Sequence, residues 1–180
     1  MDIMLKYNIC FIKRGQDILL LNRNAPSWMG CWNGIGGKLE EREEPRASMF
    51  RELYEETNIR VKEDDLHFKG IITWTVDGAR FGGMYTYLAE LPASFEYETP
   101  LKTEEGILDW KAIGWILDEH NVGIALNIPH TLNLLLYDKG CYRHHCTYIQ
   151  GRLTSYEATP LDPRFETDEA IRESLMGAYR

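Results

Sequence analysis

The stretch that decides the fold is residues 37–59, which read GKLEEREEPRASMFRELYEETNI. Pro45 stands where a first-turn proline is tolerated, and apolar side chains recur after it at helical intervals, so the stretch predicts an amphipathic helix over residues 45–57. Three glutamates on that helix are spaced i, i+3 and i+4: Glu52, Glu55 and Glu56. Their carboxylates should therefore share one helix face within about 6 Å of axial rise.

Such a patch is unfavourable unless a cation lies near it. Like charges at these spacings destabilise a helix, and their repulsion raises the pKa of each carboxyl group. Several hard oxygen ligands suit Mg²⁺, with Mn²⁺ as a substitute, and Mg²⁺ held by a few carboxylates and substrate phosphates is usual at phosphate-transferring sites. A solvated acidic helix face is the alternative interpretation.

The residues just before the helix favour a bound ligand over that alternative. Residues 32–38 read WNGIGGK, and such a glycine-rich stretch can bring its backbone close to a ligand or place a carbonyl on a metal. Glu43 and Arg51 supply an ion pair that we expect to tie this loop to the helix.

Residues 37–59 resemble the Nudix box of the Nudix hydrolase family. That pattern is Gly, five residues, Glu, seven residues, Arg-Glu, an aliphatic residue, one residue, Glu-Glu, one residue, Gly and an aliphatic residue. The chain matches it at Gly37, Glu43, Arg51, Glu52, Leu53, Glu55, Glu56 and Ile59. It departs at Asn58, where the pattern has glycine, but asparagine also tolerates the left-handed conformation that ends helices.

The resemblance implies a fold and a site. The fold is an α/β/α sandwich around a mixed β-sheet, whereas the hydrophobic pattern alone indicates only α/β or α+β. The metal ligands would be the Gly37 carbonyl, Glu52, Glu55, Glu56 and a loop carboxylate, Glu105. Glu56 or a loop glutamate would accept the proton of the attacking water, and Arg51 with Glu43 would orient the helix carboxylates. For Glu105 and its neighbour Glu104, a solvated turn is the alternative.

A narrower similarity concerns the substrate. Residues 30–38 resemble those of MutT-type enzymes, which hydrolyse oxidised purine nucleoside triphosphates, and the similarity covers most of residues 4–155, weakly after residue 60. An asparagine at the position of Asn33 hydrogen-bonds the purine base in that subgroup, and a turn residue before Gly34 is the alternative. The subgroup reads the oxidised base with acidic residues near the second helix, where this chain has Asn127 and Ile128 instead, so Asn127 is the candidate substrate contact there.

Other side chains are candidates for contacting a nucleotide. Lys38 is a candidate for phosphate, with a surface lysine as the alternative. Five aromatic residues are candidates for stacking on a base, and core packing is the alternative for each: Tyr7, Trp28, Trp32, Phe81 and Tyr85.

Length and charge set further limits. The 180 residues, 44% of them hydrophobic, suffice for one domain, which we expect at residues 1–157, followed by an acidic tail at 158–180 with a short helix near 168–176. A net charge of −8 disfavours stable binding to nucleic acids or to membrane surfaces but leaves small phosphorylated substrates possible. The sequence has no apolar run near 18 residues and no signal peptide, so we expect a cytoplasmic protein.

The rest of the chain alternates between strand and helix patterns. Strands are expected at residues 3–12, 17–22, 66–76, 82–91, 107–116 and within 142–155, and a second helix at 127–138 with Asn127 as its cap and Gly140 at its end. Hairpin turns are expected at 13–17 and at Asp77-Gly78. The CYRHHC run at 141–146 lacks the second ligand pair that zinc sites need, so its cysteines, like Cys10 and Cys31, are expected to be free thiols.

Three functional hypotheses follow. The first is an Mg²⁺-dependent hydrolase that splits a nucleoside triphosphate, such as 8-oxo-dGTP, into monophosphate and pyrophosphate, and so cleanses the nucleotide pool. The second is a hydrolase of a nucleotide sugar, ADP-ribose or a dinucleotide polyphosphate. The third is a catalytically inactive nucleotide-binding regulatory module, which the intact glutamate set disfavours. A homodimer remains possible, because the tail could dock on the domain, join two subunits or stay mobile.

Overall fold

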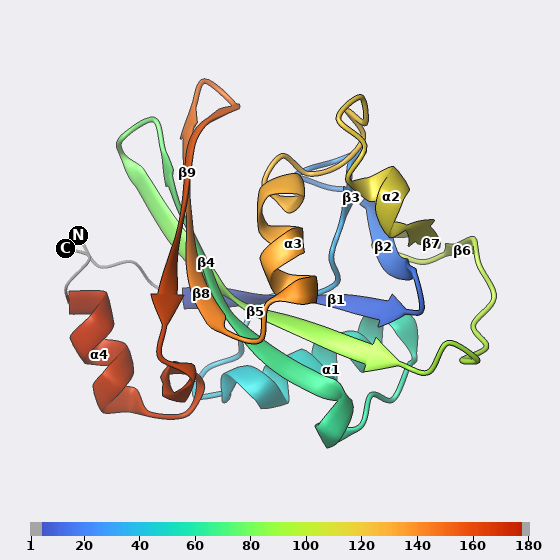
Figure 1. The fold of residues 1–180 in the computed structure, drawn as a ribbon, viewed down its shortest axis with the longest axis horizontal. Helices are drawn as coiled ribbons and strands as arrows, with labels where there is room; N and C mark the ends of the chain where they lie inside the picture. Colours follow the sequence, from blue (N-terminus) through green and yellow to red (C-terminus); the bar gives the residue numbers. More distant parts are fainter. Residues whose placement is uncertain (1–4, 178–180) are drawn as a thin grey trace.

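A single mixed β-sheet organises the computed structural model, which describes residues 5–177 (Figure 1). Its strands are β1 (Leu5–Arg14), β2 (Asp17–Arg23), β3 (Trp32–Asn33), β4 (Leu66–Val76), β5 (Arg80–Leu91), β6 (Leu101–Lys102), β7 (Gly106–Ala112), β8 (Cys141–Ile149) and β9 (Arg152–Leu161). They are ordered β6-β7-β2-β1-β5-β4-β8-β9, with β3 paired to β2. The β1·β5 and β4·β8 pairs are parallel and the others antiparallel.

Helices cover both faces of this sheet (Figure 1). One face carries α1 (Pro45–Thr57), the 3₁₀ turn η2 (Pro163–Glu166) and α4 (Glu169–Gly177), and the other carries α2 (Ile113–Ile116) and α3 (Ile128–Tyr137). A further 3₁₀ turn, η1 (Glu63–Asp65), leads from α1 into β4. The α/β/α sandwich around a mixed sheet is thus confirmed.

The central strand β1 shows why the sequence forms two cores. Its residues 8–12 are all buried, because alternate side chains point to opposite faces and both faces are covered. Cys10 and Ile12 join the core beneath α1, whereas Ile9 and Phe11 join the core beneath α3. Residues 9–12 therefore form an unbroken apolar run within the strand.

Helix α1 has the bounds that the sequence predicts. It begins at Pro45 and ends before Asn58, which adopts the left-handed conformation with φ of 59° and donates its N–H to the carbonyl of Tyr54 at 2.8 Å. Asn58 therefore caps the helix where the Nudix pattern has glycine. Met49 and Leu53 bury the inner face, so the glutamate face is held in a fixed orientation to the sheet.

Other element predictions need correction at their ends. The strand expected at 107–116 stops at Ala112, because the chain turns into the short helix α2. The region 142–155 is a hairpin of β8 and β9, since Gln150 and Gly151, with φ of 50° and 75°, form a two-residue turn. For the first predicted strand, residues 3 and 4 lie outside the described residues, and β1 extends to Arg14.

The second helix and the two expected hairpins are close to prediction. Asn127 precedes α3 as expected but makes no capping hydrogen bond with its side chain, and the helix ends at Tyr137, before Gly140. Turns join β1 to β2 and β4 to β5 where expected, the second through Asp77 and Gly78 with φ of 52° and 66°.

The described part of the C-terminal segment packs on the domain. Phe165 is fully buried in the core beneath α1, and the Glu166 carboxylate accepts hydrogen bonds from Arg46 at 2.8 and 3.3 Å and from the Tyr87 hydroxyl at 3.1 Å. Strand β9 continues past residue 157 to Leu161, and the predicted short helix is α4. A domain end at 157 stays a prediction, and residues 1–4 and 178–180 lie outside the described range.

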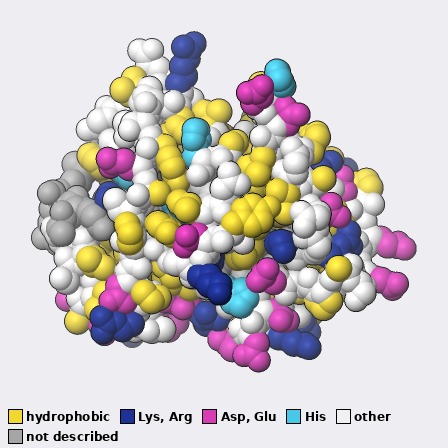
Figure 2. Space-filling view, in the orientation of Figure 1, with side chains coloured by type: hydrophobic (Ala, Val, Ile, Leu, Met, Phe, Trp, Pro, Cys, Tyr) yellow, Lys and Arg dark blue, Asp and Glu magenta, His cyan; other side chains and the backbone are white. Residues whose placement is uncertain are grey.

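The surface carries charges of both signs. On the face shown in Figure 2, hydrophobic side chains lie across the centre, and basic and acidic side chains are intermixed along the lower edge. None of the helices within residues 5–177 has the length and apolar character that crossing a membrane requires.

Candidate active site

The site begins with the glycine loop between β3 and α1. Cys10 and Ile35 exchange backbone hydrogen bonds of 2.7 and 2.9 Å, which hold the loop against β1. A Cβ at Gly36 would overlap the carbonyl of Asn8, and a Cβ at Gly37 would lie 2.5 Å from the carboxylate carbon of Glu52. Only glycine lets the loop approach both β1 and the glutamate helix this closely.

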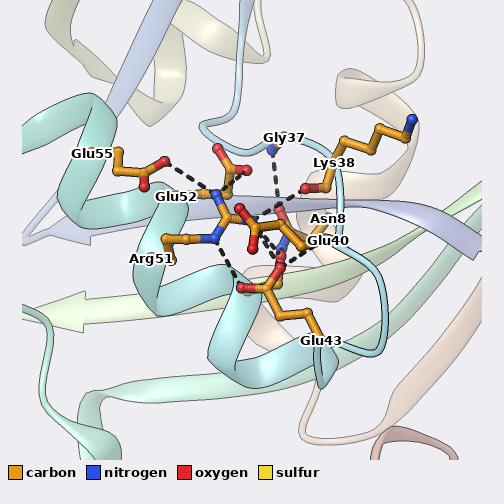
Figure 3. A network of polar contacts seen from close by, with 9 residues as sticks. Asn8, Gly37, Lys38, Glu40, Glu43, Arg51, Glu52 and Glu55 are labelled. Atoms are coloured by element: carbon orange, nitrogen blue, oxygen red, sulfur yellow. Dashed lines mark hydrogen bonds and ion pairs between the residues drawn. The ribbon is translucent and has the colours of Figure 1, made fainter.

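Arg51 is the hub of a charge network on α1 (Figure 3). Its guanidinium donates two hydrogen bonds of 2.8 Å to Glu43, one of 2.8 Å to Glu52 and one of 3.1 Å to Glu55. It also reaches the Lys38 carbonyl at 3.2 Å, so the predicted ion pair does tie the loop to the helix. The hydrogen bonds from Arg51 lower the pKa of Glu43 to about 2.

Glu56 lies in a different environment from the other helix carboxylates. Burial, followed by the charges of Glu52 and Glu105, raises its pKa to about 8, against the opposing effects of Arg23 and the Gly36 amide. Its Oε2 atom is buried and has no hydrogen-bond partner among the residues that the structure describes. Burial also raises the pKa of Glu52. An anionic Glu56 therefore requires a cation beside it.

The residues present fit a divalent cation. They offer a buried Glu56 oxygen without a partner in the described part of the chain, a second buried carboxylate, Glu52, in contact with Gly37, and the exposed carboxylate of Glu55 one turn along the helix from Glu52. Within residues 5–177 no three His, Cys, Asp or Glu side chains already surround one point. Glu52 and Glu55 are each turned toward Arg51.

Glu105 reaches the same region from another part of the chain. It lies in the turn before β7, where its carbonyl accepts the Asn24 N–H at 2.9 Å. The antiparallel β2·β7 pair sets Arg23 opposite Gly106, so the turn is held beside the end of β2. The structure thus brings Glu105 close enough to Glu56 for its charge to raise the Glu56 pKa, although Glu105 itself is exposed.

A cavity of about 580 Å³ opens beside these carboxylates. Gly36, Gly37 and Arg23 line one end, next to Glu56. Of the predicted substrate contacts, Tyr7, Asn33 and Asn127 line the cavity.

Two predicted substrate contacts lie outside the cavity wall. The Trp32 backbone bonds to Gly123 and Ala125, and its ring lies 4.3 Å from the Lys111 ammonium. Lys38 is exposed, and its side chain points away from the glutamates (Figure 3). Tyr85, a stacking candidate, packs instead in the core against Phe68 and Phe165.

Sequence reasoning missed several residues of the cavity wall. They are Asn8, Arg23, Trp74, Arg80, Met84 and Tyr148. Trp28, one of the five stacking candidates, also lines the cavity. The parallel β4·β8 pair brings two of them together, since Trp74 lies opposite Cys146 and Val76 opposite Tyr148. The Trp28 and Tyr148 rings meet with centroids 6.0 Å apart. No local pattern signals such long-range neighbours, although Arg23, a cation at the end of an apolar strand, could have been proposed.

Comparisons with known proteins agree with this geometry. The family model described as NUDIX domain matches residues 6–121. A Bacillus subtilis (strain 168) protein described as an uncharacterized Nudix hydrolase, YvcI, is 30% identical over 156 residues, or 84% of this chain and 92% of that protein. The mutator MutT protein of Bacillus halodurans superposes with a TM-score of 0.69 at 25% identity, covering 86% of this chain and 97% of the other.

A more distant match shows the fold alone. The bifunctional NMN adenylyltransferase/ADP ribose pyrophosphatase of Francisella tularensis has a TM-score of 0.61 at 17% identity, covering 77% of this chain and 42% of that one. The family match spans more than half of the chain, and it contains the whole glutamate motif that the structure places beside the cavity. The chain belongs to the Nudix hydrolase family, whose enzymes act on phosphoric anhydride bonds.

Proposed function

We propose that this chain hydrolyses nucleoside triphosphates to the monophosphate and pyrophosphate in a reaction that requires Mg²⁺, for which Mn²⁺ can substitute. The observation that carries the proposal is the half-buried Glu56 carboxylate, whose Oε2 atom is fully buried. It has an oxygen without a partner among the described residues and lies beside the glycine loop at the head of a nucleotide-sized cavity. Such a group needs a cation, and a hard oxygen site selects Mg²⁺ or Mn²⁺.

The expected ligands are the Gly37 carbonyl, Glu52, Glu55, Glu56 and Glu105. When bound, the cation supplies neutralisation of phosphate charge and a lowered pKa for a coordinated water. Arg51, anchored by Glu43, orients Glu52 and Glu55 on the helix face. Either Glu56 or Glu105 accepts the proton of the attacking water, and Arg23 binds a phosphate oxygen from the cavity wall.

The other end of the cavity suits a nucleobase. Trp28, Trp74 and Tyr148 provide aromatic surface there, on which a planar base can stack. Asn33 uses its side-chain oxygen to accept the Gly34 N–H at 2.9 Å, so its amide group is left to donate to a base oxygen or ring nitrogen. An oxidised purine offers this donor one further acceptor oxygen, so the proposal includes oxidised triphosphates and the cleansing of a cytoplasmic nucleotide pool, although Asn127 and Ile128 stand where the MutT-type subgroup has acidic residues.

A second substrate class within the family has its own supporting observation. Arg80 and Gly151, at the tips of two hairpins, also line the cavity. Arg80 is thus a second cationic side chain in the wall, besides Arg23. A nucleotide with a further sugar or phosphate, such as ADP-ribose, a nucleotide sugar or a dinucleotide polyphosphate, could extend to it.

A substrate panel tests the proposal. Purified protein with Mg²⁺ is incubated with normal and oxidised nucleoside triphosphates, ADP-ribose and nucleotide sugars, and the products are separated by chromatography. We expect monophosphate and pyrophosphate from triphosphates, fastest from an oxidised purine. Cleavage confined to ADP-ribose or nucleotide sugars would replace the first substrate class by the second. No cleavage of any compound would favour a nucleotide-binding module without catalysis.

A homodimer stays a prediction, which analytical ultracentrifugation would test.

A further inference from the structure

Asn8 makes an unusual connection between β1 and the glycine loop. In an antiparallel ladder every second pair of facing residues exchanges both backbone hydrogen bonds, as Cys10 and Ile35 do. Two residues along, the Asn8 N–H donates to the Gly37 carbonyl at 2.9 Å, but the Gly37 N–H donates to the side-chain Oδ1 of Asn8 at 3.1 Å. The side chain thus takes the place of a backbone acceptor at this step.

Because a side-chain oxygen replaces the backbone acceptor, the loop can leave the register of β1. Gly36 packs directly on the Asn8 carbonyl, which leaves no space for a Cβ, and Gly37 is thereby brought against the Glu52 carboxylate. If the ladder were regular here, the Gly37 peptide would be turned toward β1. The side chain of Asn8 therefore sets the orientation of the Gly36–Gly37 peptide, next to the Gly37 Cα that lies against Glu52.

The same carboxamide also holds the helix. Its Nδ2 donates to the Ser48 hydroxyl at 2.9 Å, and that hydroxyl accepts a further hydrogen bond of 3.3 Å from Arg51 (Figure 3). Asn8 is only 3% exposed, so both of its hydrogen bonds form where lost partners cannot readily be replaced by water. One side chain thus links the loop backbone, the first turns of α1 and the Arg51 network.

We propose that Asn8, which lies outside the 37–59 motif, is a positioning residue that fixes the Gly37 peptide relative to Glu52 and so sets the affinity of the site for its divalent cation. The inference rests on the proposed function only in assigning a metal to this site. Partners that hold metal ligands in place typically change metal affinity by about 10-fold to 100-fold when they are replaced.

Two measurements that need no turnover test this role. The first is hydrogen exchange of the Gly37 amide in the metal-free protein, followed by NMR. The second is binding of Mn²⁺ alone, followed by electron paramagnetic resonance. The variants are Asn8→Leu, which keeps the branched shape but neither side-chain hydrogen bond, and Asn8→Ala, which is smaller and avoids steric conflict should the bulkier leucine not be accommodated.

Two controls separate positioning from general destabilisation. Ile12→Val shortens a buried core side chain on the same strand and removes no hydrogen-bonding group of the loop or of the α1 glutamates. Ser48→Ala removes the other partner of the carboxamide and leaves the Gly37 hydrogen bond in place. Both controls should retain protection of the Gly37 amide, and Ile12→Val should also retain the wild-type affinity for Mn²⁺.

The expected result is an Asn8 variant whose Gly37 amide exchanges about 10-fold faster or more, and whose Mn²⁺ affinity falls by about 10-fold or more. Unchanged Gly37 exchange would overturn the proposal, and so would faster exchange with wild-type Mn²⁺ affinity. Should the wild-type protein bind no Mn²⁺, the metal assignment and the affinity claim would both fail, whereas absence of nucleotide turnover alone would count only against the proposed reaction.

Discussion

The two ends of the cavity are built in different ways. The glutamate end comes from one short stretch, in which the loop at residues 34–38 and α1 place Gly37, Glu52 and Glu56 together. The aromatic end is assembled from Trp28, Trp74 and Tyr148, which are far apart in the sequence. Tyr148 also lies beyond residues 6–121, where the family model matches. The arrangement of the Nudix-box carboxylates is therefore encoded locally, whereas the aromatic end of the cavity depends on the completed fold.

The largest effect is expected at Gly37, where the glycine loop lies closest to the Glu52 carboxylate. Gly37→Ala would place a Cβ against the Glu52 carboxylate and push it from its position, so we expect turnover to fall by about 100-fold. Steady-state rates at saturating Mg²⁺ measure this. Gly114→Ala is the matched control, because a Cβ there meets no atom within 4 Å in the described part of the chain. Wild-type turnover of Gly37→Ala would break the link between loop geometry and chemistry.

Acid should lower the free energy of unfolding through His144, which lies outside the glutamate site. Burial lowers the pKa of His144, on β8, from 6.5 to about 4, so the fold favours the neutral ring. The stability that the neutral ring contributes is present above pH 6.5 and is lost as the pH falls toward 4. As the pH falls from 6.5 to 4, the free energy of unfolding should decrease in both proteins, but by about 2 kcal/mol less in His144→Phe than in the wild type.

Urea unfolding at several pH values measures this difference. The Arg51–Glu43 pair serves as the internal contrast, since a Glu43 pKa of about 2 keeps that ion pair charged throughout the same range. Parallel pH profiles for the wild type and His144→Phe would show that β8 is not the acid-sensitive part.

A smaller effect is expected at the aromatic end. Trp28→Ala removes stacking surface, and loss of one base–aromatic contact costs about 1–3 kcal/mol, so KM for a nucleoside triphosphate should rise about 10-fold while kcat changes little. Trp115→Ala, which removes an exposed indole outside the cavity wall, is the control. A fall in kcat with unchanged KM would contradict the division between the two ends.

The smallest effect concerns the end of α1. Asn58 has φ of 59°, which glycine adopts without strain, so Asn58→Gly should change the free energy of unfolding by less than about 1 kcal/mol and leave turnover unchanged. Thermal unfolding and steady-state rates measure both quantities. A marked loss of turnover would show that the cap, and not only the glutamate face, positions the site.

The sequence predicts the glutamate end of the cavity better than the aromatic end. The bounds of α1, the Asn58 cap and the Glu43–Arg51 ion pair follow from spacing and local conformation, and the structure confirms them. The cavity wall around Tyr148 depends on the register of β4 against β8, which no local pattern specifies. Helix α2 was missed because four residues carry too little periodicity to distinguish a helix from the end of a strand.

The position of Trp32 illustrates a further limit. Its place beside the glycine loop suggested a contact with the base, but its ring lies against Lys111, which reaches it from β7. Arg23 and Glu105 are likewise brought to the site by the β2·β7 pairing. Sequence spacing can place side chains along one helix, whereas cross-strand register decides which distant residues join them.

The central claim is that the glutamate helix performs metal-dependent hydrolysis of nucleotides. Its most direct test follows product formation from a nucleoside triphosphate over a Mg²⁺ titration, for the wild type, for Glu56→Gln and for the exposed control Glu41→Gln. We predict monophosphate and pyrophosphate that appear only with Mg²⁺, at equal rates for the wild type and Glu41→Gln, and about 1,000-fold more slowly for Glu56→Gln. Wild-type rates from Glu56→Gln, or turnover that is independent of the metal, would contradict the account.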